Sequence, residues 1–229
     1  MGNFDFGVIY RSLGYLLRDG MTFTLTLTAV AAVGGAAIGT VLALMQLSSV
    51  KPLSWLATGY INLLRSIPLL LVIFWFYFFV PYLGAWLTGA KRPIQVGAFW
   101  SCVVTFTLFE AAYFVEIVRA GIRSVSPGQV GAAYALGMSY AQAMRNVILP
   151  QAFRNMMPVP LNQTIVLFQG TSLVYVLSVT DFLGAATKIG QRDGRQVEMY
   201  VFVALVYFAI RYALSWQVKR LQQRTVFAH

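Results

Sequence analysis

Five long apolar segments constrain this chain more than any other feature of its sequence. Each is long enough to cross about 30 Å of hydrocarbon, which takes about 20 residues of helix. Because lipid offers no partners to backbone N–H and C=O groups, segments of this kind cross a membrane as helices. The five predicted spans are residues 21–48, 53–82, 95–120, 155–179 and 197–219.

Composition agrees with a membrane protein. Of the 229 residues, 59% are hydrophobic and 10% are charged, whereas a soluble domain carries about 25% charged residues. The sequence therefore predicts an all-α, polytopic helical bundle with residues 1–229 in a single transmembrane domain. The first 20 residues contain Asp5, Arg11, Arg18 and Asp19, so we expect no cleaved signal peptide. They are interpreted as a partly amphipathic arm on the membrane surface or as a linker.

The basic residues flank the spans, which predicts an orientation by the positive-inside rule. With the N-terminus outside and the C-terminus inside, ten basic residues fall on the cytoplasmic side and seven on the outer side. The cytoplasmic set is Lys51, Arg65, Arg119, Arg123, Arg145, Arg154, Arg211, Lys219, Arg220 and Arg224. The outer set is Arg11, Arg18, Lys91, Arg92, Lys188, Arg192 and Arg195.

Several classes of function are excluded or disfavoured by the same sequence. The net charge of +10 does not indicate a nucleic-acid surface, because the basic residues do not form a patch with interleaved aromatic residues. One histidine, His229, and one cysteine, Cys102, cannot assemble a metal or nucleophilic site. The phosphate-binding pattern G-x-x-x-x-G-K-[S/T] does not occur, so no ATPase activity is expected in this chain.

Two spans carry backbone signals. Gly34 and Gly39 lie in a first span rich in small residues, which predicts close packing of that helix against another. In the second span, Pro68 restricts Ile67 and removes a helix hydrogen bond, so a break is expected at residues 66–68. Arg65 precedes this break and is interpreted either as a basic anchor at the interface or as a residue of the substrate pathway.

The third span contains two carboxylates. Because charges at membrane depth are costly, such residues normally face protein or a water-filled pathway. Glu116 and Arg119 are three residues apart and predict an ion pair. Glu110 has no charged partner within reach on its own helix, and it is the stronger candidate for the pathway.

The fourth span is polar and is interrupted by Gly170. Transporters build binding sites at the middle of the membrane from such interrupted helices. Purely structural hydrogen bonds between helices are the alternative for each residue. With Arg65 and Glu110, the predicted pathway residues are Asn162, Gln163, Gln169, Thr171 and Ser172.

Residues 124–150, "SVSPGQVGAAYALGMSYAQAMRNVILP", form the least apolar long stretch of the chain. Ser126, followed by a proline and by Gln129, and Ser139, followed by Gln142, are both signals for the start of a helix. Gly137 is a typical helix stop. The stretch therefore predicts two short capped helices that form a rigid elbow, of which the second ends before Pro150.

The segment "GAAYALGMSYAQAMRNVILP" resembles the EAA loop of ABC-importer permease subunits, and Gly131 stands where the family pattern has glutamate. The stretches "RSIPLL", "FEAAYFVEIVRAGIRSVSPGQ", "ILPQAFR" and "LFQGTSLVYVLS" resemble the polar amino acid branch of that family. Together they cover about residues 25–220. The resemblance implies the MetI-like permease fold of type I ABC importers and a bacterial inner (cytoplasmic) membrane location.

The same resemblance implies the partners and the division of labour. The partners would be a dimer of ABC ATPase subunits, a second permease, identical or homologous, and an extracytoplasmic amino-acid-binding protein. ATP and Mg²⁺ would be bound by the ATPase, and this chain would hold no cofactor and no metal. The elbow would transmit ATPase closure, and the residues that match the motif are Ala132, Ala133, Gly137, Leu149 and Pro150.

The resemblance also implies the substrate, an acidic amino acid, glutamate or aspartate, and the alternative is a cationic or neutral polar amino acid. The amide and hydroxyl groups of the fourth span suit a carboxylate, while Glu110 suits an ammonium group. A membrane enzyme is disfavoured because the predicted spans contain no His or Asp to act with Glu110. A channel would leave the capped elbow unexplained.

Overall fold

The computed structural model describes residues 4–93 and 96–226, with side chains as far as residue 223, and shows no strand within these residues. The α-helices are α1 (Phe6–Tyr15), α2 (Thr22–Gln46), α3 (Lys51–Ser66), α4 (Leu69–Phe74), α5 (Val80–Thr88), α6 (Ala98–Arg123), α7 (Pro127–Ala135), α8 (Tyr140–Ala143), α9 (Leu149–Met156), α10 (Pro158–Gly170), α11 (Phe182–Asp193) and α12 (Gln196–Val226). Three π-helical turns, η1 (Leu16–Met21), η2 (Trp75–Phe79) and η3 (Met144–Ile148), and one 3₁₀ helix, η4 (Thr171–Leu177), join some of them.

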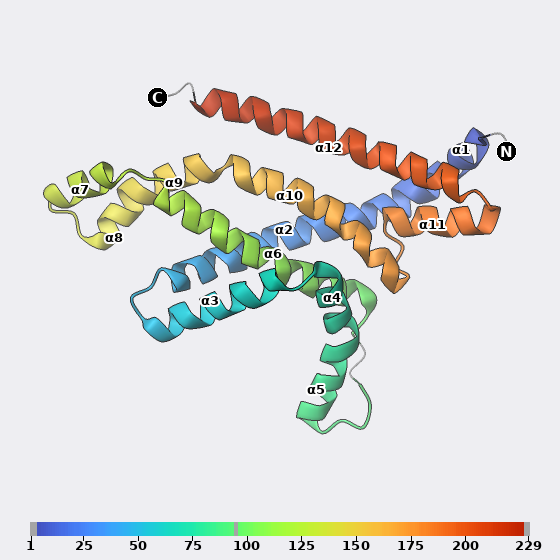
Figure 1. The fold of residues 1–229 in the computed structure, drawn as a ribbon, viewed down its shortest axis with the longest axis horizontal. Helices are drawn as coiled ribbons and strands as arrows, with labels where there is room; N and C mark the ends of the chain where they lie inside the picture. The colour runs from blue at the N-terminus through green and yellow to red at the C-terminus, as the bar shows by residue number, and fades with distance from the viewer. Residues whose placement is uncertain (1–3, 94–95, 227–229) are drawn as a thin grey trace.

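The main helices run roughly along one direction, with the two chain ends at opposite ends of the bundle (Figure 1). The elbow formed by α7 and α8 lies at the same end as the C-terminus, and α11 lies at the other end with α1. Helix α12 runs beside α10 along one side of the molecule, and α2 and α6 cross through its middle. This arrangement is the one that an odd number of crossings requires.

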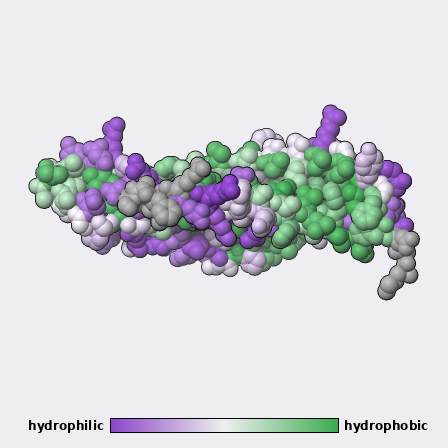
Figure 2. Space-filling model, turned by 90° about the horizontal axis from the view of Figure 1, so that it is seen from above, coloured by the Kyte–Doolittle hydropathy of each residue, from purple (hydrophilic) through white to green (hydrophobic). Residues whose placement is uncertain are grey.

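Among the described residues, four continuous helical stretches are long and apolar enough to cross a membrane, namely Phe6–Gln46, Leu69–Thr88, Ala98–Arg123 and Gln196–Gln223. A fifth crossing is possible if Pro158–Leu177 and Phe182–Asp193, which meet at a bend of 45°, act as one broken span. In Figure 2 hydrophobic residues cover most of the right part of the face that α12 dominates. Hydrophilic residues gather towards the left, where α12 ends.

The N-terminal arm is helical and not an irregular linker, and its place at the membrane surface stays a prediction. It continues through η1 into α2 as one helical stretch of 41 residues. Its amphipathic character is real, because Val8 and Leu16 are fully buried against residues of α11 and α12 such as Phe182 and Met199. The arm is continuous with the first predicted span because the helix passes through Arg18 and Asp19 as a π-helical turn.

The predicted second span is two separate helices. Ile67 is extended, with φ −110° and ψ 133°, so α3 ends at Ser66 and α4 begins after Pro68. The expected break is therefore confirmed, but α3 and the α4–α5 segment do not form one crossing. Helix α3 packs beside α2 and α6, whereas the α4–α5 segment leaves the bundle as an arm (Figure 1).

Helices α2 and α6 form the closest helix pair of the core. A methyl group added to Gly39 would lie 2.5 Å from Phe114 Cβ and 2.7 Å from the carbonyl oxygen of Ala111. One added to Gly34 would lie 2.8 Å from Thr107 Cγ2. The small-residue face predicted for the first span is therefore confirmed, and it presses α2 directly onto the backbone of α6.

Candidate functional site

The elbow is built from the caps that its sequence predicts. Ser126 Oγ accepts a hydrogen bond from the Gln129 amide at 3.4 Å, which starts α7. Ser139 starts α8 with a full capping box, in which its own amide donates to Gln142 Oε1 at 2.8 Å. Between the two helices Gly137 has φ +76°, a conformation that glycine adopts without strain.

The second helix of the elbow does not end before Pro150. It continues through η3 and α9 as far as Met156, with Pro150 in the first turn of α9. Proline lacks an amide proton and crowds the preceding turn of an α-helix. The wider π-helical turn Met144–Ile148 comes immediately before it and accommodates it without ending the helix.

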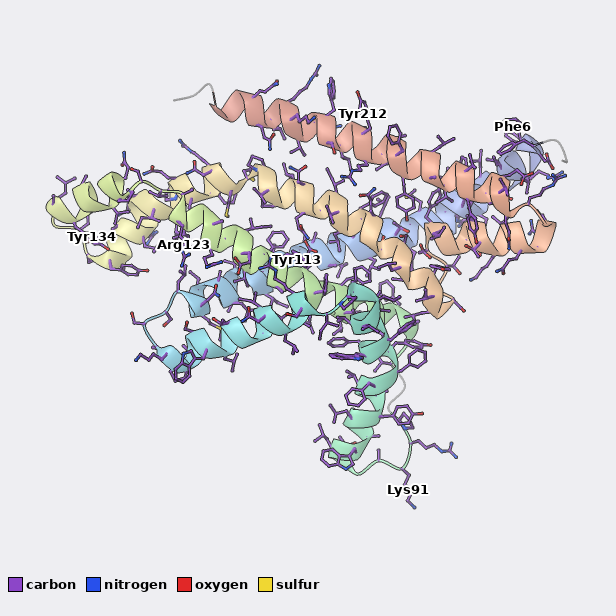
Figure 3. All side chains as sticks on the ribbon, viewed as in Figure 1. Phe6, Lys91, Tyr113, Arg123, Tyr134 and Tyr212 are labelled. Carbon is purple, nitrogen blue, oxygen red and sulfur yellow. The ribbon has the colours of Figure 1, made fainter. Side chains whose placement is uncertain are left out.

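The tip of the elbow exposes large apolar side chains. Leu136 is 78% exposed, Tyr140 61% and Tyr134 46%, and Tyr134 is seen at the end of the molecule in Figure 3. The signal for this surface in the sequence is the presence of large apolar and aromatic residues within an otherwise polar stretch. Water-facing apolar residues grouped in this way mark a contact surface.

The five motif residues of the elbow do not share one environment. Ala132, Gly137, Leu149 and Pro150 are exposed, but Ala133 is only 2% exposed and packs inside the elbow. Alanine at position 133 therefore allows the elbow to close on itself. Any direct contact with another subunit is therefore expected from the exposed neighbours of Ala133.

The base of the elbow is fixed to the long helix α6. Asn155 Nδ2 donates to Ser124 Oγ at 2.8 Å, and Ile148 and Ala152 pack with Val125 in one buried cluster. Arg123 ends α6 beside this junction (Figure 3). Because α9 leads directly into α10, the elbow is connected to the polar span by continuous helix.

Glu110 and Gln163 meet in the interior of the chain. Gln163 Nε2 donates to Glu110 Oε2 at 3.3 Å, while Glu110 Oε1 is buried without a partner among the described residues. Glu110 is 1% exposed and lies against Gly35 of α2. The structure thus brings together two of the predicted pathway residues, at the place where α2, α6 and α10 converge.

A second polar pair lies on the outer side of α10. Arg211 on α12 donates through Nη1 to Gln169 Oε1 at 2.5 Å. Asn162, Val166 and Gln169 follow one another at helical spacing, and Asn162 and Val166 are exposed. Gln163 is six residues from Gln169, about 240° around the helix, so the two polar pairs occupy different sides of α10.

Arg211, which the sequence predicts among the cytoplasmic basic residues, lies within the long apolar helix α12, and its side of the membrane stays a prediction. It stands at the midpoint of α12, 15 residues after Gln196 and eight before Lys219. That corresponds to about 22 Å from the start of the helix and about 12 Å from Lys219. The signal was present in the sequence, since Arg211 is the one charged residue between Met199 and Val218.

Two predicted pathway residues, Thr171 and Ser172, donate hydrogen bonds to backbone carbonyls of the preceding helix. Thr171 Oγ1 donates to the Phe168 carbonyl at 2.7 Å, and Ser172 Oγ donates to the Gln169 carbonyl at 2.8 Å. Thr171 is also fully buried. These bonds occur where α10 passes into the 3₁₀ helix η4, so the hydroxyl groups stabilise the interruption of the span.

Arg65 belongs to an ion-pair cluster apart from the other polar residues. Its Nη1 lies 3.5 Å from Glu116 Oε1, and its guanidinium lies 5.6 Å from the ring centre of Tyr113. Glu116 also pairs with Arg119, as the sequence predicts. The cluster ties the end of α3, at the break before Pro68, to α6, as the position of Tyr113 in Figure 3 illustrates.

The predicted pathway residues do not line the two larger surface hollows of the described residues. These hollows have volumes of about 450 and 360 Å³ and lie beside α5 and beside α11. Within residues 4–93 and 96–226, no group of three or more His, Cys, Asp or Glu side chains is arranged to hold a metal ion. On α10, Asn162 is exposed, whereas Gln169 is half-buried beside Arg211 of α12.

Known proteins match this chain over nearly its whole length. Residues 18–227 match the family model described as "Binding-protein-dependent transport system inner membrane component". The chain is 51% identical to the glutamate/aspartate import permease protein GltK of Escherichia coli O6:H1, across 98% of this chain and 100% of that protein. It is 32% identical to the arginine transport system permease protein ArtQ of Bacillus subtilis, across 97% of each.

Two solved structures of ABC transporters have a fold similar to that of this chain. The crystal structure of an amino acid ABC transporter with histidines matches with a TM-score of 0.87 and 34% identity, over 96% of this chain and 98% of that one. The MetNI methionine ABC transporter in an inward-facing conformation matches with a TM-score of 0.67 and 19% identity, over 90% and 96% of the two chains. The second likeness supports the fold alone.

Proposed function

The chain belongs to the family of binding-protein-dependent transport system inner membrane components, and from that premise we propose that it imports acidic amino acids with the energy of ATP. Membership makes it a multi-pass permease subunit of an ABC importer in the inner membrane. It also makes an ATPase and an extracytoplasmic binding protein its partners. The substrate, the second permease and the mechanism of coupling are the proposed parts.

The elbow is the observation that carries the proposal. It is stiff, because each of its two helices begins at a serine cap and a glycine with positive φ separates them. It exposes Leu136 and Tyr140 at one end of the molecule and is continuous with α10 through α9. A partner ATPase that binds ATP and Mg²⁺ would seat this tip and pass its closure to the polar span.

Gly131 bears on how the tip docks. It stands where the resemblance places glutamate, and nothing lies within 4 Å of a methyl group added there. From Ile117 to Thr180 the chain contains no acidic residue but has Arg119, Arg123, Arg145 and Arg154. Docking would therefore depend on the exposed apolar side chains and on basic residues of the elbow in place of a carboxylate.

A second permease, identical or homologous, would complete the pathway. Asn162 is exposed on α10, and the half-buried Gln169 lies on the same face, where Arg211 of α12 contacts it. Polar groups at membrane depth normally face protein or water, so a second permease is needed to shield them from lipid. The substrate would then pass between the two chains along α10.

An acidic substrate is supported by the 51% identity to a permease named for glutamate and aspartate. A cationic or neutral polar substrate is the alternative, and the relative named for arginine is 32% identical. Amide side chains such as Asn162 and Gln169 hydrogen-bond carboxylates readily. They are uncharged, so the choice of substrate depends on charged groups nearby.

Uptake by the reconstituted importer tests the substrate class. Proteoliposomes would contain this chain, its partner permease and the ATPase, with the binding protein outside and ATP inside. We expect uptake of L-glutamate and L-aspartate to exceed that of L-glutamine and L-arginine at equal concentration. Preferential uptake of L-arginine, with no uptake of L-glutamate, would replace the acidic substrate by the cationic alternative. Equal uptake with and without ATP would contradict the importer mechanism itself.

A pair of glycine variants tests the coupling role of the elbow. Gly137→Val places a branched side chain at φ +76°, which costs about 1–2 kcal/mol. Gly131→Val makes the same change in α7, where nothing lies within 4 Å. We expect ATP-driven uptake to fall about 5- to 30-fold with Gly137→Val and less than twofold with Gly131→Val. Unchanged uptake and unchanged ATPase binding in Gly137→Val would contradict the coupling role.

A further inference from the structure

We propose that Arg211 is an anion-binding residue of the translocation pathway and holds a carboxylate of the transported amino acid. This inference rests on the proposed function, since it places the transported solute along α10. Arg211 is not part of the family-like motifs. It would supply the positive charge that the amide groups of the fourth span lack.

The position of Arg211 in the helix is the first support. Arginine at hydrocarbon depth is costly unless it faces protein or water. Arg211 lies at the midpoint of α12, with apolar residues on both sides and Lys219 about 12 Å further along. It is exposed on this chain, so contact with lipid would leave its charge without compensation. A water-filled route or a second protein surface is required at this point.

The direction of the side chain is the second support. Instead of extending along α12 towards the membrane surface, the guanidinium crosses to α10 and donates to Gln169 Oε1 at 2.5 Å. One of its five N–H groups is used in this bond. A guanidinium offers paired N–H groups that match the two oxygens of a carboxylate, and the donors of Arg211 that do not bind Gln169 are available for such a contact.

The surroundings of Arg211 lack a competing carboxylate. Among the described side chains it forms no ion pair, unlike Arg65, Arg119 and Arg195. The buried acid Glu110 is bound to Gln163 on a different side of α10. Gln169 uses its oxygen for Arg211, which leaves its amide nitrogen as a donor, and Asn162 lies about two turns away on the same face. All three residues can therefore donate to an anion.

The role of Gln169 is to position the arginine. It stands immediately before Gly170, where α10 ends and η4 begins. A conformational change that bends the span at this break would move Gln169 and with it the guanidinium. The affinity of the site for a carboxylate would then depend on the state of the transporter, which is what release on the inner side requires.

The test compares Arg211→Met with Arg220→Met in the reconstituted importer. Arg220 is a matched control because it lies on the same helix, nine residues further on, and stacks on the Trp216 ring at 3.4 Å. We expect Arg211→Met to lower L-glutamate uptake at limiting concentration by about 10- to 100-fold, the range for hydrogen bonds to a charged group. We expect Arg220→Met to stay within twofold of wild type. Arg211→Lys keeps the charge without the paired donors, so its L-glutamate uptake should lie between those of Arg211→Met and Arg220→Met.

A second measurement separates binding from a structural role. In the purified complex without binding protein, millimolar L-glutamate should raise the Tm of the wild type and of Arg220→Met, but not that of Arg211→Met. A residue that only pairs α12 with α10 would lower the Tm without ligand and leave the ligand-induced shift unchanged. That result, or uptake by Arg211→Met within twofold of wild type, overturns the proposal.

Failure of the substrate proposal can be distinguished from failure of the Arg211 proposal. If the wild type imports L-glutamine or L-arginine and not L-glutamate, the same Arg211 comparison is made with that amino acid, whose α-carboxylate is the expected ligand. If Arg211→Met does not assemble, Arg211→Gln keeps a neutral donor for Gln169 and should show the same loss of uptake. Loss of assembly in both variants with normal uptake in Arg211→Lys would assign Arg211 to helix pairing alone and overturn the proposal.

Discussion

ATP-driven uptake is expected to fall at least about thirtyfold when Leu136 is replaced by aspartate, because the ATPase then no longer binds the elbow. Leu136 is 78% exposed at the tip, between Tyr134 and Tyr140. Truncating a side chain at the centre of an interface costs about 2–4 kcal/mol, which corresponds to about 30- to 1,000-fold, and a buried unpaired carboxylate adds to that cost. Copurification of the ATPase with the permease, together with uptake in proteoliposomes, measures the effect.

The control for Leu136→Asp is Tyr10→Asp. Tyr10 is 80% exposed on α1, at the opposite end of the molecule from the elbow. It offers an equally exposed apolar residue that an ATPase on the elbow does not reach. We expect Tyr10→Asp to retain the ATPase in full. If Leu136→Asp retained it equally well, the exposed tip would not be the docking surface.

The second large effect is expected at the contact between α2 and α6. A Gly39→Leu variant should lower the Tm of the purified chain by about 5 to 10 °C. Overpacking costs about 1–3 kcal/mol or more. Each kcal/mol shifts the Tm of a chain of this size by about 2–4 °C. The obstruction is backbone as well as side chain, since the added Cβ would meet the Ala111 carbonyl oxygen at 2.7 Å. Rotation of one side chain therefore cannot relieve it.

Gly59→Leu is the matched control for this steric effect. Gly59 is exposed on α3, and nothing lies within 4 Å of a methyl group added there. The variant should keep the Tm of the wild type within about 2 °C, since exposed substitutions usually change stability by less than about 0.5 kcal/mol. Equal loss of stability in the two variants would show that close approach of α2 and α6 is not the cause.

Features of the fold that depend on local chemistry were predictable from the sequence. Each is fixed by residues adjacent in the chain, as in the caps at Ser126 and Ser139, the turn at Gly137 and the break at Pro68. The end of the elbow helix was wrong, because a proline stops an α-helix but not a helix that has a π-helical turn before it. A pattern of residue types does not show where such a wider turn will form.

The sequence shows which polar residues lie in the spans, but it does not show which of them contact one another. The sequence identified Glu110, Gln163 and Gln169 as polar residues at membrane depth, and only the packing of α2, α6, α10 and α12 decides which of them meet. Arg211 was missed because it was counted with the flanking charges, although it lies in the middle of its span. Its partner on α10 is 42 residues away in the chain, beyond the reach of any local pattern.

The unbroken helical path from Ser139 to Gly170 has a mechanical consequence. α8, η3, α9 and α10 follow one another with Met157 alone between α9 and α10, and its backbone is also helical. The path bends where α9 meets α10 (Figure 1), so its 31 residues do not form one straight rod. Helix α10 alone has 13 residues and is about 20 Å long, so a tilt of about 10° moves its Gly170 end by about 3 Å, the length of a hydrogen bond. A movement of the ATPase that tilts α10 by this amount would therefore be enough to make or break the contacts beside Gly170.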